Sequence, residues 1–284
     1  MPIPSYVMLK ELRKLHMRRY QDPIDESLRG WNWDRPPVKP RAYLGLTVSE
    51  VASYCPTKKD VWLRRVVKAV PETNEALKLG SLIHDVIHTT IECFRRYVSS
   101  GEDILNAYND VVDEVLKKTT IPEQISNWIT SLVKYIVIQL LAEVLWSSVG
   151  DGINPWLPWI SEVRVDGSLL GLSKNLRIDA ITGSNVVVDF KVAKPSENHR
   201  IAITAYAMAL EANLEVPIDY GLIIYVNGLG NTPKVSVESL YISSDLRKDF
   251  IDTRDELIDM IISEREPPKA TSCSPTCPFR NSCR

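Results

Sequence analysis

The pattern of apolar residues changes near Pro158, and this change limits the folds open to the chain. Before it, long amphipathic periods predict helices over 75–98, 104–118 and 123–149. After it, short apolar runs predict a strand over 160–166, a second strand around 176–179 within the segment 171–182, and a third over 185–193. A helix over 197–213, strands over 220–226 and 235–242, and a helix over 245–264 are predicted to follow. A strand meander that leads into a crossover helix predicts an α/β fold with a mixed central sheet flanked by helices.

Three regions are expected along the chain. Residues 1–158 form a mainly helical region with a basic first helix and Cys55, residues 159–265 form the sheet core, and residues 266–284 form a tail that contains cysteines. A proline-rich stretch over 35–40 separates the basic helix from the rest, because proline cannot continue a helix. Thr47 and Glu50 have the spacing of a capping box and predict the start of a short helix.

Charge is nearly balanced along the 284 residues, with a formal net charge of −2. This balance excludes a uniformly basic nucleic-acid-binding protein but allows a local basic face. The predicted helix over 57–70 carries five basic side chains and one acidic side chain, Asp60. It is either a phosphate-contacting surface that does not read base sequence or an ordinary solvated helix face.

No secretory signal is expected at the N-terminus, which is basic and lacks an apolar core followed by a cleavage site. The longest apolar stretch, over 128–146, contains Lys134 and Glu143 and therefore predicts a buried helix rather than a membrane span. We expect a cytoplasmic protein with no membrane association, in which cysteines are reduced and a tight cysteine group binds metal.

One charged residue, Asp189, interrupts the apolar run of a predicted strand. A buried charge costs several kcal/mol unless it is paired or binds a metal. Lys191 lies two positions on and shares its face, because strand side chains alternate. A tight turn at Gly183 and Ser184 would place Asp179 of the preceding strand beside this pair.

Two carboxylates and an amine that converge in this way suit divalent-metal chemistry. Carboxylate oxygens are the preferred ligands of Mg²⁺ and Mn²⁺, and Lys191 can orient a water molecule or stabilise charge on a phosphate. Glu162, on the first strand, supplies a third carboxylate. The alternatives are a simple Asp–Lys salt bridge on a half-exposed sheet and a solvated Glu162.

Three cysteines crowd into the last twelve residues, at Cys273, Cys277 and Cys283. With Cys55 they form a set of four thiolates, which suits a 4Fe–4S cluster or tetrahedral zinc equally well. The alternatives are an unstructured C-terminus with free thiols and a Cys55 that is merely buried. Cys93 is predicted to be an ordinary buried thiol.

The carboxylate pattern resembles the motif of the PD-(D/E)XK nuclease superfamily: Asp179, nine residues, then Asp189, Phe190 and Lys191. Gly80 and His84, upstream, resemble the Gly-xxx-His signature of its RecB-like members. The resemblance implies a restriction-endonuclease-like core and a metal site. The predicted metal residues are His84, Asp179, Asp189 and Phe190.

A third motif of these nucleases, Gln-xxx-Tyr on the crossover helix, is half present. Tyr206 matches the tyrosine, which the resemblance places among the catalytic residues with Asp179, Asp189, Lys191 and Glu162. Ala202 occupies the position of the glutamine. This departure bears on catalytic competence.

The cysteine arrangement, one upstream of the core and three after it, resembles the iron–sulfur RecB-like nucleases. These include the Cas-four exonucleases of CRISPR adaptation, and the blocks over 29–33 and 36–40 resemble their longer archaeal variant, Csa-one. The resemblance implies a 4Fe–4S cluster on Cys55, Cys273, Cys277 and Cys283.

The function implied by this resemblance is a metal-dependent DNA exonuclease that trims spacer precursors during CRISPR adaptation. Its partners would be DNA, single-stranded or with single-stranded ends, and the integrase proteins of adaptation. Two alternatives stay open: a catalytically weak DNA-binding or scaffolding subunit of the integration complex, and a RecB-like DNA-repair nuclease.

Overall fold

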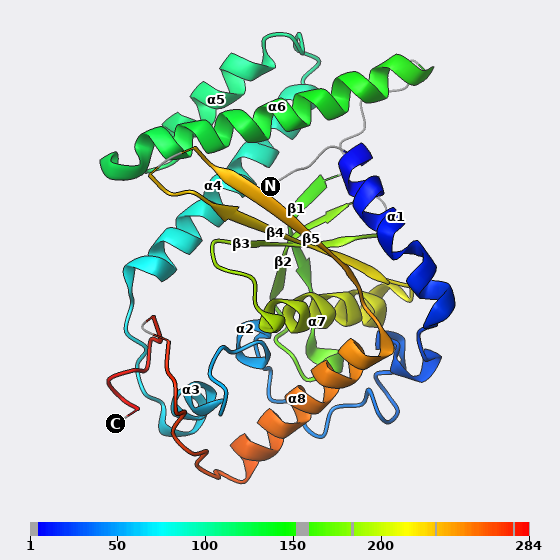
Figure 1. The fold of residues 1–284 in the computed structure, drawn as a ribbon, viewed down its shortest axis with the longest axis vertical. Coiled ribbons are helices and arrows are strands. Elements are labelled where there is room, and N and C mark those ends of the chain that lie inside the picture. The colour runs from blue at the N-terminus through cyan, green and yellow to red at the C-terminus, as the bar shows by residue number, and fades with distance from the viewer. Residues whose placement is uncertain (1–4, 152–158, 183–184, 231, 275, 284) are drawn as a thin grey trace.

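A computed structural model describes residues 5–151, 159–182, 185–230, 232–274 and 276–283. Within these residues the sheet has five strands in sequential order, with helices on both faces (Figure 1). Only β3 and β4 run parallel, and the other neighbours are antiparallel. The strands are β1 Trp159–Val165, β2 Leu176–Thr182, β3 Val187–Lys191, β4 Tyr220–Asn227 and β5 Lys234–Tyr241.

This topology confirms the predicted mixed sheet flanked by helices. The crossover between the parallel strands is α7, Glu197–Leu214, as expected from the order of elements. The predicted turn at Gly183 and Ser184 lies outside the described residues. On either side of it, β2 and β3 pair in antiparallel fashion, as the prediction required.

Both faces of β3 and β4 are buried, which explains why these two strands read as continuous apolar runs. Val188, Leu222 and Ile224 face a core shared with α4 Glu75–Ser99, α5 Ala107–Lys118 and α6 Ser126–Asp151. The alternate residues, Val187 and Ile223, face a second core shared with α2 Val48–Val51, α7 and α8 Ser244–Ile262.

One helix in the described part of the chain is long and apolar enough to be a candidate membrane span, over Glu123–Leu145 with mean hydropathy of 1.6. Half of this window is buried inside the protein, where α6 packs on α4 and α5. The core helix of a folded domain can have the same length and hydropathy as a membrane span. The half-buried position of this helix therefore agrees with the buried helix predicted from the sequence.

The N-terminal region wraps around the sheet. Helix α1, Ser5–Gln21, packs along the edge strand β5, as the blue helix of Figure 1 shows. Short turns follow over Glu26–Leu28 and Gly30–Asn32, and further short turns occur over Glu123–Ile125 and Ser168–Leu170. The capping box of Thr47 and Glu50 is present at the start of α2, as predicted.

The helix predicted over 57–70 is shorter than expected. It consists of α3, Lys59–Trp62, and a π-helical turn over Leu63–Val67. Lys58 and Lys68 flank it with left-handed backbone angles, φ 55° and 59°, which interrupt a right-handed helix at both ends. The helix predicted from 104 begins instead at Ala107.

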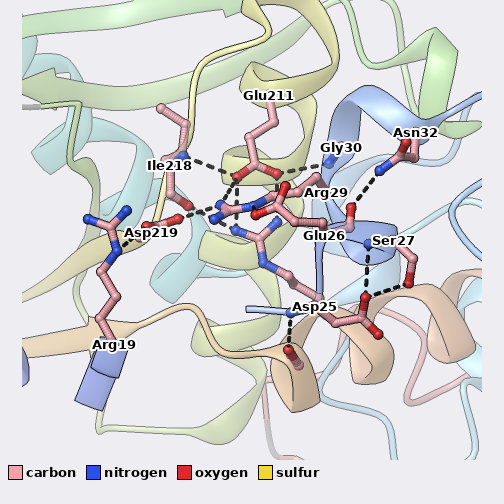
Figure 2. A network of polar contacts seen from close by, with 12 residues as sticks. Arg19, Asp25, Glu26, Ser27, Arg29, Gly30, Asn32, Glu211, Ile218 and Asp219 are labelled. Atoms are coloured by element: carbon pink, nitrogen blue, oxygen red, sulfur yellow. Dashed lines mark hydrogen bonds and ion pairs between the residues drawn. The ribbon is translucent and has the colours of Figure 1, made fainter. Parts of the chain in front are cut away.

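A buried network of charges fastens the N-terminal segment to the core (Figure 2). Glu211 of α7 accepts hydrogen bonds from Arg29 at 2.9 Å, from the Gly30 amide at 2.8 Å and from Arg247 at 2.6 and 2.9 Å. Asp219 pairs with Arg29 from the other side. Buried charges are tolerated here because each is paired and hydrogen-bonded.

Candidate active site

The candidate site lies where β2 and β3 separate. Their last paired residues are Ala180 and Val188, and the next position along the two strands is occupied by Asp179 and Asp189. There the Phe190 amide donates to the Asp179 side chain, Oδ2, at 2.7 Å. The Asp179 carboxylate thus accepts the hydrogen bond that a backbone carbonyl of β2 would accept if the two strands were still paired here.

Asp189 and Lys191 form the predicted pair on β3. The Lys191 Nζ lies 2.8 Å from Oδ1 and 2.7 Å from Oδ2 of Asp189. Only the Oδ1 contact has hydrogen-bond geometry, so the buried Oδ2 has no hydrogen-bond partner. The Asp189 side chain is 3% exposed and that of Lys191 is 24% exposed, so the amine lies nearer the surface.

His84 reaches the site from α4. Its Nδ1 lies 3.2 Å from Oδ1 of Asp179, and its ring meets the Phe190 ring edge-on with centroids 6.4 Å apart. The structure therefore brings together five residues that the sequence predicted for one site: His84, Asp179, Asp189, Phe190 and Lys191. His88, one turn further on, bonds instead to Ser161 at 2.9 Å.

The pKa values of the two carboxyl groups, Asp179 and Asp189, are shifted in opposite directions. Burial alone would raise the pKa of Asp179, but the hydrogen bond and charge of His84, together with the charge of Lys191, hold it well below its usual range. At Asp189 burial outweighs the opposing effect of Lys191, and the Asp179 charge adds to it, so the pKa rises to about 7. Burial would lower the pKa of Lys191, but both carboxylates outweigh it and raise that pKa.

Glu162 and Tyr206 border the site. Glu162 lies on β1 between residues that pair with Ala180 and Ile178, and so adjoins Asp179. Its φ of 54° is a left-handed angle, which is uncommon for a residue with a side chain. Burial, followed by the charges of the three carboxylates, raises the pKa of Tyr206 well above its usual value, so its phenol stays protonated.

Ala202 lies one turn before Tyr206 on α7. It is 5% exposed and packs in the second hydrophobic core. This position of the helix therefore presents a methyl group where the resembling nucleases have an amide.

The donor set fits a divalent cation. It offers carboxylate oxygens, one of them buried without a hydrogen bond, and an imidazole, which together suit Mn²⁺ or Mg²⁺. Among the described residues, no three His, Cys, Asp or Glu side chains are already grouped at metal-site spacing. At Asp189, the Lys191 ammonium lies beside both oxygens.

The four cysteines predicted to act together line one cavity of about 260 Å³. Cys55 comes from the loop between α2 and α3, whereas Cys273, Cys277 and Cys283 come from the tail. All are free thiols. Four thiols line one cavity, although no three of them are grouped at metal-site spacing in this structure. We call this cavity with its four cysteines the clasp.

Contacts other than the cysteines also hold the described part of the tail in place. The Glu72 amide donates to the Pro278 carbonyl at 2.8 Å, and Arg64 stacks on the Phe279 ring at 5.5 Å. Asn74 and Asn281 add further hydrogen bonds, and Phe279 is 1% exposed. The alternative of an unstructured tail is therefore wrong for these residues.

The model of the CRISPR-associated exonuclease Csa1 family matches residues 3–284. The chain belongs to this family. A Csa1 exonuclease of Thermoproteus tenax is 35% identical over 282 residues, covering 96% of each chain. Another, from Saccharolobus solfataricus, is 32% identical over 272 residues, covering 92% of each chain.

Membership of the Csa1 family confirms the predicted kinship with CRISPR-associated exonucleases. It favours a CRISPR role over the alternative of a general repair nuclease.

The sequence analysis did not predict a chain of polar contacts beside the site of this Csa1 family member. Tyr54 bonds to His199 at 2.5 Å, His199 bonds to Tyr225 at 3.0 Å, and Tyr225 donates to Glu238 at 3.2 Å. Its members come from a loop, a helix and two strands, so no local spacing predicts it. The only signal was a histidine near the start of the crossover helix.

Proposed function

We propose that this Csa1 family member is a metal-dependent DNA exonuclease that trims spacer precursors during CRISPR adaptation. The observation that carries the proposal is the meeting of Asp179, Asp189, Lys191 and His84 at the opening between β2 and β3. Paired carboxylates beside an amine and an imidazole suit metal-assisted phosphodiester hydrolysis.

The metal residues would be His84, Asp179, Asp189 and the main-chain oxygen of Phe190. A Mg²⁺ or Mn²⁺ ion bound there supplies Lewis-acid polarisation of the phosphate and lowers the pKa of a bound water.

The protein groups around the metal residues have separable roles. Lys191 is positively charged and partly exposed, so its ammonium can hold a phosphate oxygen or orient the attacking water. Tyr206 keeps its proton and can therefore donate a hydrogen bond to a phosphate oxygen. His84 fixes Asp179, and Glu162 adds a carboxylate at the same edge, where it is paired with Arg177 at 3.4 Å.

The clasp would hold a 4Fe–4S cluster, or alternatively zinc, on Cys55, Cys273, Cys277 and Cys283. Its role would be structural, because it joins the loop before α3 to the tail. By the crosslink estimate, closing a loop of over 200 residues stabilises a fold by about 5 kcal/mol.

The test is degradation of end-labelled single-stranded DNA by anaerobically purified protein with Mn²⁺. We expect mononucleotides or short products to be released from linear DNA, whereas closed circles of the same sequence stay intact. Cleavage of circles at the rate of linear DNA would contradict an exonuclease.

A second candidate function is a DNA-binding or scaffolding subunit for the integrase proteins, and the observation that favours it is the apolar Ala202. Tight DNA binding with no metal-dependent degradation would support this alternative. Co-purification with integrase proteins tests the adaptation role separately from cleavage.

A further inference from the structure

Tyr54 is an exposed aromatic residue that is hydrogen-bonded to the protein beside the candidate active site. It lies in the loop directly before Cys55, and it is 57% exposed. Exposed tyrosines in loops usually rotate freely, but the hydroxyl of this one lies 2.5 Å from Nε2 of the buried His199. The two rings meet edge-on, with centroids 5.7 Å apart.

The hydrogen-bond chain behind Tyr54 passes through β4, the strand that pairs with the one carrying Lys191. His199 Nδ1 lies 3.0 Å from the Tyr225 hydroxyl, and Tyr225 is the direct partner of Lys191 in the pairing of β3 with β4. Because paired residues of parallel strands point to the same face, Tyr225 and Lys191 share a face of the sheet. The hydrogen bonds through His199 and Tyr225 therefore hold Tyr54 on the side of the sheet that carries Lys191.

Each proton in this chain can be assigned. Burial, reinforced by the charge of Lys191, lowers the pKa of His199 to about 4, so its ring is neutral and has one donor and one acceptor. Tyr225 donates to Glu238, so it must accept from His199 Nδ1. Nε2 is then the acceptor, and the Tyr54 hydroxyl donates to it.

The consequence concerns what Tyr54 can offer a ligand. Its only hydroxyl proton is used inside the protein, so it does not donate a hydrogen bond to a phosphate. The part that remains available is the exposed aromatic ring. Aromatic rings beside basic groups bind single-stranded nucleic acid by stacking on bases, whatever the sequence.

We propose that Tyr54 is a stacking platform for one base of the DNA strand whose phosphate lies at Lys191. The proposal rests on the proposed function, since it assumes that single-stranded DNA enters this site. The hydrogen bonds through His199 position the ring, and Lys191 holds the phosphate of the same strand.

The test measures the affinity of the anaerobically purified protein for a fluorescein-labelled oligothymidine by fluorescence anisotropy. Ca²⁺ replaces Mn²⁺ in this assay so that the DNA is bound without being cut. Tyr54→Ala should weaken binding about tenfold, the loss expected for one stacked base. Tyr54→Phe should stay within about threefold of wild type, because the ring is kept. Tyr43→Ala is the matched control, since Tyr43 is also an exposed tyrosine at 58%, and it should bind like wild type.

A second measurement separates stacking from a structural effect. A single abasic sugar is moved along the oligonucleotide, and at one position it should weaken binding by wild type but not by Tyr54→Ala. Equal binding by Tyr54→Ala and wild type, or an abasic penalty that is unchanged in the variant, would overturn the proposal. A wild-type protein that binds but does not cut DNA would contradict only the proposed exonuclease.

Discussion

At the scale of single residues, the site could be predicted because a strand has a period of two. Asp189 and Lys191 are two positions apart on an otherwise apolar strand, and this pattern alone places them on one face. The partners of His199 could not be predicted, because Tyr54 and Tyr225 lie 145 and 26 residues away in sequence. Only the fold brings them together.

His199 gives the folded protein a measurable dependence on pH. Its pKa is lowered to about 4 by burial, against 6.5 for an ordinary histidine, so the unfolded chain binds more protons between these values. The contribution of His199 to stability is therefore full above about pH 6.5 and is lost as the pH falls towards 4, by at most about 3 kcal/mol.

The measurement is the free energy of unfolding in urea at pH 7 and at pH 5. His199→Gln should lose less stability than wild type between these values, by about 2 kcal/mol. His16→Gln, at an exposed position of α1, should behave like wild type. Identical pH dependence in wild type and His199→Gln would contradict the assignment of a buried neutral imidazole.

At the scale of elements, the strands and the long helices follow from periodicity, whereas the region around α3 does not. The basic composition over 57–70 favoured one continuous helix, but Lys58 and Lys68 adopt left-handed angles and confine it to a short turn. These angles place Cys55 and the α3 region against the tail, a long-range arrangement that local propensity does not encode. The clasp depends on this packing.

Cys55→Ser tests whether the clasp holds metal. Anaerobically purified wild type should contain about four iron atoms, or one zinc, per chain, and Cys55→Ser should contain little of either. The variant should also unfold at a lower temperature, because the crosslink between the α2–α3 loop and the tail is removed.

Cys93→Ser is the matched control, since Cys93 is a free, buried cysteine outside the clasp cavity. It should keep the metal content of wild type. Equal metal content in Cys55→Ser and Cys93→Ser would contradict a metal-binding clasp.

At the scale of the whole molecule, two long-range connections hold the chain around its sheet. The network of Arg29, Glu211 and Arg247 ties the N-terminal segment to α7 and α8 (Figure 2). The tail returns to the region before α4, near the point where Figure 1 shows the red C-terminus beside α3. Neither connection could be predicted in detail, because Arg29 and Glu211 are 182 residues apart and buried ion pairs have no local signature.

The central claim is that this scaffold positions Asp179, Asp189 and Lys191 for DNA hydrolysis, and Asp189→Asn tests it most directly. The measurement is the single-turnover rate of Mn²⁺-dependent degradation of linear single-stranded DNA, with folding checked by circular dichroism. Asp189→Asn should reduce this rate by at least about a thousandfold, as expected when a metal-binding carboxylate of a catalytic site is lost. Asp249→Asn, an exposed carboxylate on α8, should cut like wild type, and a folded Asp189→Asn protein that cuts at the same rate would contradict the account.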